Sequence, residues 1–168
     1  MMRRDKLDHL VRAASTLTGH RRFVLVGSAV ILVRCNNIPG DMLLTPEVDL
    51  FVPDVPDSEA VSDAIEADIG RGSSFHQQYG YYCDGVSAGT AVMPTDWQQR
   101  AVPYESSGCP GVTVIVADPE DIALPKIVAW REKDKDWLKS GLRSGIFALN
   151  LIRPASRACL IQRLDWER

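Results

Sequence analysis

A short apolar run that ends in a Gly-Ser pair places the tightest constraint on how this chain folds. Residues 23–26 read Phe-Val-Leu-Val, which is typical of a buried strand, and Gly27 and Ser28 follow directly. Residues 29–34 then have helical spacing of apolar side chains, so the segment predicts a strand, a tight turn and a helix. Residues 47–52 alternate apolar and polar side chains, which predicts a second strand soon after.

The rest of the pattern predicts an α/β fold, with a mixed sheet and helices on its faces. Apolar spacing predicts helices over residues 5–17 and 59–69. Four segments rich in β-branched and aromatic residues are predicted strands: 79–83, 90–93, 100–104 and 112–116. Asp118 and Pro119 are typical of a helix start.

Helical segments are predicted to follow as far as residue 142, with a last helix at 154–166. We expect one domain overall. It would hold an α/β core over 1–117 and a C-terminal helical segment over 118–168 packed on that core.

Composition fits a globular protein: 45% of the 168 residues are hydrophobic. The net charge of −3 does not favour nucleic acid as a bulk partner. The four cysteines are far apart, with no Cys-x-x-Cys pair and no nearby His, which argues against a zinc site or a disulfide framework. No apolar run approaches the ~20 residues of a membrane span. We therefore expect a cytoplasmic protein with no membrane contact.

Two acidic residues stand at alternate positions of the second predicted strand. Glu47 and Asp49 project to the same side of a sheet. Carboxylates this close repel each other unless a cation lies between them. Magnesium is the simple candidate, because it prefers oxygen ligands and usually arrives with substrate phosphates.

The turn at Gly27 and Ser28 stands between a strand and a helix N-terminus, where free backbone N–H groups favour an anion such as phosphate. Taken alone, a Gly-Ser pair after a strand is ordinarily a tight turn, and a Glu-x-Asp pair is ordinarily a solvated strand face. Together they predict an anion site and a metal site on consecutive strand ends.

These residues resemble the signature of the nucleotidyltransferase superfamily, which is carried here by residues 23–29, Arg34 and residues 45–52. Residues 118–138 resemble the lysine-and-aspartate segment of the branch related to abortive-infection (AbiEii-type) toxins. Residues 82–86 and 90–94, followed by Trp97 and Arg100, are similar to an uncharacterised bacterial family within that branch. The resemblance covers most of the chain, from residue 21 to residue 142.

The resemblance implies magnesium-dependent transfer of a nucleotide from a nucleoside triphosphate to an RNA or protein acceptor. A toxin-like role and an antitoxin partner are further expectations from it. Glu47 and Asp49 would hold the metal, and Asp84 is the candidate for the third catalytic carboxylate. The remaining residues would bind the nucleotide: Gly27 and Ser28 its triphosphate, Lys126 its phosphate charge, and Asp134 or Asp136 the nucleotide or the metal.

Two other interpretations stay open at the level of sequence. The chain could be a catalytically degenerate nucleotidyltransferase fold that serves as a binding or regulatory module, or an unrelated α/β domain. The position of Asp84 separates the first of these from an enzyme, because without a third carboxylate nothing would act as a general base.

Overall fold

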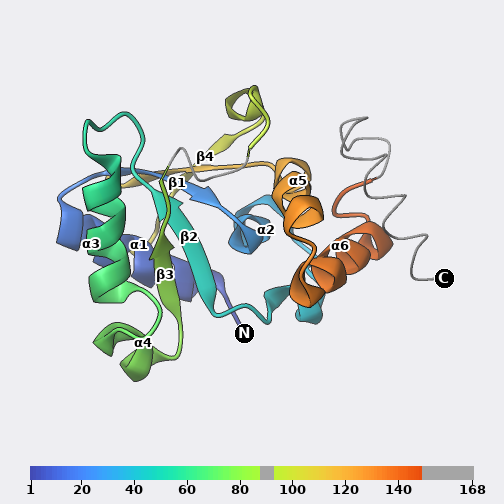
Figure 1. The fold of residues 1–168 in the computed structure, drawn as a ribbon, viewed down its shortest axis with the longest axis horizontal. Coiled ribbons are helices and arrows are strands. Elements are labelled where there is room, and N and C mark those ends of the chain that lie inside the picture. The colour runs from blue at the N-terminus through green and yellow to red at the C-terminus, as the bar shows by residue number, and fades with distance from the viewer. Residues whose placement is uncertain (88–92, 149–168) are drawn as a thin grey trace.

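The computed structural model describes residues 1–87 and 93–148, and a five-stranded mixed sheet stands at its centre (Figure 1). The order across the sheet is β3-β2-β1-β5-β4. The strands are β1 (Arg22–Val26), β2 (Glu47–Phe51), β3 (Tyr82–Gly85), β4 (Val102–Glu105) and β5 (Thr113–Val116). Strand β1 is parallel to β5 and antiparallel to β2, while β3 is parallel to β2 and β4 is antiparallel to β5. The predicted α/β fold with a mixed sheet is confirmed.

Helix α1 (Arg4–Thr18) runs behind the sheet in the view of Figure 1, and α3 (Ser58–Ile69) packs against β3 and α1. The apolar stripe of α1 that the sequence predicts is fully buried at Leu7, Leu10 and Val11. Asp8 on the same helix accepts a 2.8 Å hydrogen bond from the hydroxyl of Tyr104 in β4. Helix α1 is therefore fixed to the sheet by both apolar packing and a polar contact.

The predicted strand, turn and helix at Gly27 are confirmed. Strand β1 ends at Val26, Gly27 has a φ of 70°, and a 3-10 turn (Ser28–Val30) leads into α2 (Ile31–Arg34). A positive φ costs glycine almost nothing, because glycine has no Cβ to meet the backbone. The chain can therefore turn sharply at the end of a buried strand.

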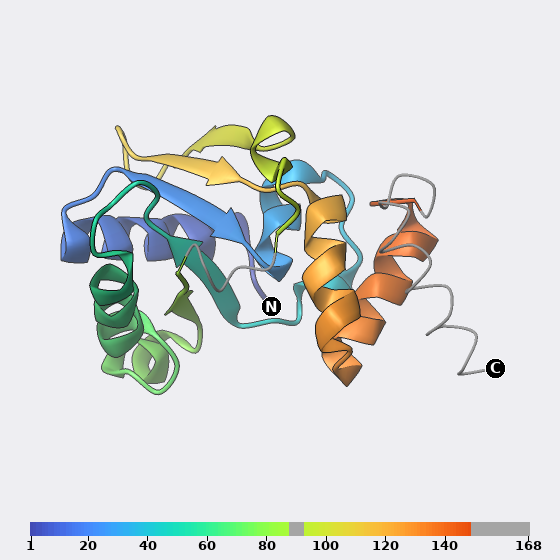
Figure 2. The same ribbon diagram turned by 45° about the horizontal axis from the view of Figure 1, so that its top comes forward.

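Helices α5 (Pro119–Ala129) and α6 (Glu132–Ser144) lie side by side at one end of the sheet (Figure 2). The predicted start of α5 is confirmed, because the Asp118 side chain accepts a hydrogen bond from the Glu120 N–H and Pro119 follows the cap. Trp130, with a φ of 50°, joins the two helices. Within the described residues, no helix is both long and apolar enough to cross a lipid bilayer.

The first of the four predicted strands, at residues 79–83, is wrong in its bounds because a helix precedes it. Residues Ser74–Tyr79 form a short helix, α4, because the Ser73 side chain caps its N-terminus and Gly80 ends it in the left-handed conformation. The strand predicted at 79–83 is displaced to Tyr82–Gly85. The predicted strand at 90–93 falls largely, and the predicted helix at 154–166 wholly, outside the described residues.

Candidate active site

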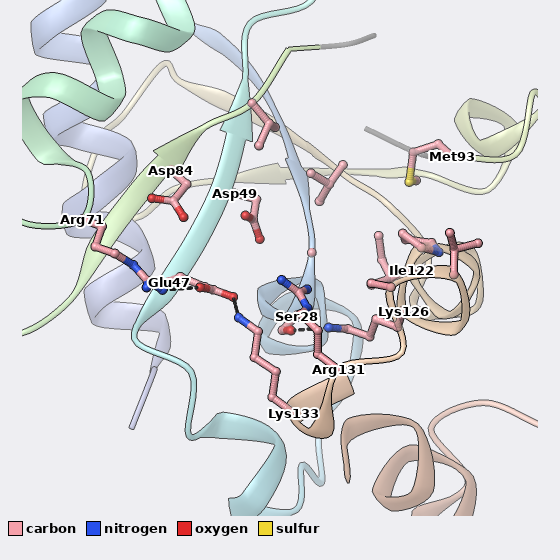
Figure 3. Close-up of a pocket in the computed structure, with 16 residues that line it drawn as sticks. Ser28, Glu47, Asp49, Arg71, Asp84, Met93, Ile122, Lys126, Arg131 and Lys133 are labelled. Atoms are coloured by element: carbon pink, nitrogen blue, oxygen red, sulfur yellow. Dashed lines mark hydrogen bonds and ion pairs between the residues drawn. The ribbon is translucent and has the colours of Figure 1, made fainter. Parts of the chain in front are cut away.

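Three carboxylates line one wall of a cavity at the end of β1. The register of β2 with β3 sets Asp49 beside Asp84, and the register of β1 with β2 sets Val26 beside Asp49. Since side chains alternate along a strand, Glu47, Asp49 and Asp84 project from the same face of the sheet. They lie on one side of a cavity (Figure 3). The volume of this cavity is about 600 Å³. The structure thus brings together the three carboxylates expected from the sequence, with Asp84 inside a strand.

Asp49 lies directly over the backbone of Gly27. A Cβ atom on Gly27 would stand 1.8 Å from Oδ2 of Asp49, so the position of this carboxylate requires glycine there. Among the described residues, no hydrogen bond or ion pair reaches the Asp49 carboxylate. Burial, together with the charges of Glu47 and Asp84, raises the pKa of Asp49 to about 7.

Glu47, in contrast, is held by several groups. Lys133 Nζ donates to Oε1 of Glu47 at 2.8 Å, and the hydroxyl of Tyr82 donates to Oε2 at 3.0 Å (Figure 3). Arg71 adds an ion pair at 3.6 Å and also donates to the Tyr82 hydroxyl. Burial raises the pKa of Glu47, but the hydrogen bonds from Lys133 and Tyr82 and the charges of Lys133 and Lys126 together outweigh it, so the net pKa is lowered.

Lys126 reaches the turn after β1 from α5 and is only 8% exposed. Its ammonium group donates to Oγ of Ser28 at 2.8 Å and to Oδ1 of Asp134 at 3.2 Å. Burial lowers the pKa of Lys126, although the charge of Asp134 opposes that shift. Gly27, Ser28 and Lys126 all line the cavity, as a phosphate site at this turn requires.

Asp134 and Asp136, the two aspartates predicted near the nucleotide, have different positions. Asp134 is fully buried and accepts hydrogen bonds from Lys126 and from Nε of Arg131 at 2.7 Å, so it orients these two cations and does not line the cavity. Asp136 is exposed and lines a second cavity of about 600 Å³. The two cavities adjoin, since Glu47 and Lys133 line both.

Sequence reasoning missed the roles of Lys133 and Arg71. Lys133 belongs to a charge run in which nothing distinguishes it from Lys135, which pairs with Glu132 instead. Arg71 stands between Gly70 and Gly72 in a loop and carries no recognisable signal. Only the tertiary structure brings these two cations to Glu47: α6 packs against α5 and against Gly40–Leu43 shortly before β2, and Arg71 contacts Tyr82 of β3.

The donor set suits a magnesium ion held jointly with phosphates. Glu47 and Asp49 stand at alternate positions of β2 with Asp84 beside Asp49 in β3, and Asp49 lacks a hydrogen-bond or ion-pair partner among the described residues. Within residues 1–87 and 93–148, no three His, Cys, Asp or Glu side chains converge closely enough to form a metal site by themselves. This is compatible with magnesium, which is commonly held by one or two carboxylates and completed by water and substrate oxygens.

A comparison of the chain with models of known protein families gives a match. Residues 5–157 match the model of a family described as a nucleotidyltransferase of unknown function (DUF6036). The chain belongs to this family. The expected nucleotidyltransferase superfamily is therefore confirmed. No curated protein and no solved structure matches the chain significantly.

The two walls of the cavity carry opposite charges, one wall being acidic and the other basic. The sheet supplies the carboxylates of β2 and β3, while the cations come mainly from α5, from α6 and from Arg131 between these helices (Figure 3). Lys126 and Arg131 line the cavity on one side, and the three carboxylates line it on the other.

Proposed function

We propose that the chain is a magnesium-dependent nucleotidyltransferase that moves a nucleotide from a nucleoside triphosphate to an acceptor. The observation that carries this proposal is the convergence of Glu47, Asp49 and Asp84 on a cavity whose other wall holds Lys126 and a glycine turn. Family membership supports the general reaction, and the site geometry supports the residue roles proposed below.

The chemistry is a displacement at phosphorus. An acceptor hydroxyl oxygen forms a bond to the α-phosphorus, the bond from that phosphorus to the bridging oxygen breaks, and pyrophosphate leaves. Magnesium, held by Glu47 and Asp49, would supply Lewis-acid stabilisation of the charge on the phosphates. The backbone of Gly27 and the Ser28 hydroxyl would bind the triphosphate, and Lys126 would offset its negative charge.

Asp84 takes the proton of the acceptor hydroxyl in this proposal. Burial, with the charges of Glu47 and Glu66, raises the pKa of Asp84 from its ordinary value. A raised pKa makes a carboxylate a better proton acceptor near neutral pH. Asp84 stands beside Asp49 in the sheet, so it faces the place where the metal and the acceptor would meet.

The test is transfer of label from each of the four α-³²P-labelled nucleoside triphosphates to total RNA and to the protein itself. We expect label transfer by the native chain with Mg²⁺, none with EDTA, and a loss of about 10²–10³-fold in Asp49→Asn. Asp63→Asn is the matched control, because Asp63 is an exposed acid on α3 away from the cavity. It should keep full activity.

Label transfer together with calorimetry separates the enzyme from a degenerate binding or regulatory module. A chain that transfers no label from any of the four triphosphates would contradict the enzyme. Absence of triphosphate and magnesium binding by calorimetry would further support the degenerate module.

We also propose that the chain is related to the AbiEii-type toxin branch, with an RNA or protein acceptor and an antitoxin partner. The resemblance of residues 118–138 to that branch supports this. Induced expression in a bacterial culture should arrest growth, and Asp49→Asn should abolish the arrest. Unchanged growth with abundant native chain would contradict the toxin role.

Cys35, Cys83 and Cys109 are free thiols, which supports a reducing compartment such as the cytoplasm.

A further inference from the structure

We propose that Lys133 is a placeholder cation, meaning that it pairs with the Glu47 carboxylate while the site is empty and is replaced there by the divalent metal when a nucleotide binds. The Lys133 side chain then pairs with the triphosphate. This inference rests on the proposed function, and it adds a positioning residue that neither the sequence pattern nor the family description supplies.

The contacts of Glu47 show why it needs to be released. Lys133 occupies Oε1, while Tyr82 and Arg71 approach Oε2, so both oxygens are engaged. Asp49, two residues along the same strand, has no such partner among the described residues. In the empty site, the ammonium group of Lys133 therefore supplies the positive charge that balances the Glu47 carboxylate.

Exposure shows which partner is free to move. The side chain of Lys133 is 50% exposed, whereas that of Glu47 is 14% exposed. Lys133 lies in the first turn of α6, so its long side chain can swing while its backbone stays fixed in the helix. Glu47 is anchored in β2 by the pairing of that strand with β3. The exchange therefore needs only a change of rotamer at Lys133.

The pair also stands where the two cavities meet. Glu47 and Lys133 line both of them, as do Ser28 and Lys126. Opening the ion pair would join the two spaces beside Asp49. A transfer reaction needs two substrates to meet at the carboxylates, and a joined cavity gives room for both.

The test measures metal affinity in the absence of any nucleotide. We would titrate Mn²⁺ into the native chain and into Lys133→Gln, with Lys133→Met as a second neutral variant that keeps the aliphatic stem. Removing a partly exposed competing cation should tighten Mn²⁺ binding about fivefold. In the presence of Mn²⁺, inorganic tripolyphosphate should bind the same variants about fivefold more weakly.

Two controls fix the interpretation. Lys135→Gln removes an equal charge from α6, at a residue that pairs with Glu132 instead of Glu47, and should change neither affinity. Lys133→Arg keeps the ion pair and should bind Mn²⁺ as the native chain does. A purely structural Lys133 would lower thermal stability when replaced, without tightening Mn²⁺ binding.

Failure of this inference differs from failure of the proposed function. Unchanged or weaker Mn²⁺ binding in both neutral variants, in a chain whose native form binds Mn²⁺ and transfers label, overturns the role of Lys133 alone. Unchanged tripolyphosphate affinity in the neutral variants contradicts the proposal that Lys133 pairs with the triphosphate after it leaves Glu47. If the native chain binds no Mn²⁺, the metal dependence in the proposed function is contradicted, and so is the placeholder role of Lys133.

Discussion

At the scale of single residues, Asp49 and Glu47 differ in how their charge is balanced. Glu47 has Lys133 and Tyr82 within hydrogen-bond distance, and its pKa is lowered. Asp49 is reached by the more distant charges of Lys126 and Lys133, and its pKa is raised to about 7 by burial and by its acidic neighbours. A group that is costly to ionise in the folded state is a candidate for a functional role.

The raised pKa of Asp49 predicts how stability depends on pH. Its pKa is about 7 when folded and 3.8 in the reference state, so the folded chain binds more protons between these values. The contribution of Asp49 to stability is therefore present at low pH and lost as pH rises toward 7. In EDTA, native stability relative to Asp49→Asn should fall by up to about 3 kcal/mol between pH 5 and pH 8.

Urea unfolding at the two pH values checks this difference. Asp84 also has a raised pKa, but it remains in both proteins and largely cancels in the comparison. Parallel stability profiles for the native chain and the variant would show that Asp49 is not desolvated as described.

At the scale of secondary-structure elements, the end of β1 and the middle of β2 fit each other at Gly27. Strand β1 ends at Val26, which pairs with Asp49 of the antiparallel strand β2, and glycine at position 27 leaves the space that the carboxylate fills. On the other side of the cavity, the junction of α5 and α6 is held by the buried pair of Lys126 and Asp134. Each side of the site thus depends on one junction between elements.

Gly27→Ala should damage both folding and activity. The new Cβ would meet Oδ2 of Asp49, and φ at this residue is 70°. We expect a loss of about 1–3 kcal/mol in unfolding free energy and loss of label transfer. Gly19→Ala is the control: Gly19 has a similar φ of 73°, but its Cβ would meet nothing within 4 Å. It should cost stability and leave transfer intact.

The buried pair predicts a contrast between two aspartates of α6. Asp134→Ala leaves Lys126 buried with its strongest partner removed, so we expect a loss of about 3–5 kcal/mol in unfolding free energy. Asp136→Ala changes an exposed residue and should stay within about 0.5 kcal/mol of the native value. Chemical denaturation of both variants measures this, and equal effects would contradict the role given to the Lys126–Asp134 pair.

At the scale of the whole molecule, the site forms between two parts of the structure. The sheet provides its acids, and the pair of helices at its end provides most of its cations (Figures 1 and 2). A ligand that binds to both parts ties them together. It stabilises the folded chain because the unfolded chain cannot bind it in this way.

Binding of a triphosphate with magnesium should therefore raise the melting temperature. At about 100 times the dissociation constant the gain is about 2.7 kcal/mol, which corresponds to roughly 5–10 °C for a chain of this size. Asp49→Asn should show a much smaller rise under the same conditions. Equal shifts with and without magnesium would indicate that the triphosphate binds without the metal.

Local sequence pattern was enough to predict the first half of the site. The run before Gly27, and the alternation that places Glu47 and Asp49 on one face, depend only on neighbours along the chain. The cap at Asp118 is local in the same way. Strands β1 and β2, the turn between β1 and α2, and the start of α5 were predictable for that reason.

Only the tertiary structure decided the rest, because it depends on contacts between residues far apart in the chain. The pairing of β3 with β2 brings Asp84 beside Asp49, and no local signal sets that register. Helix packing turns Asp134 inward toward Lys126 and carries Lys133 to Glu47. The sequence determined which residue types could form an acidic site. The packing of α5 and α6 on each other and on the turns at Ser28–Val30 and Gly40–Leu43 determined which cations face it.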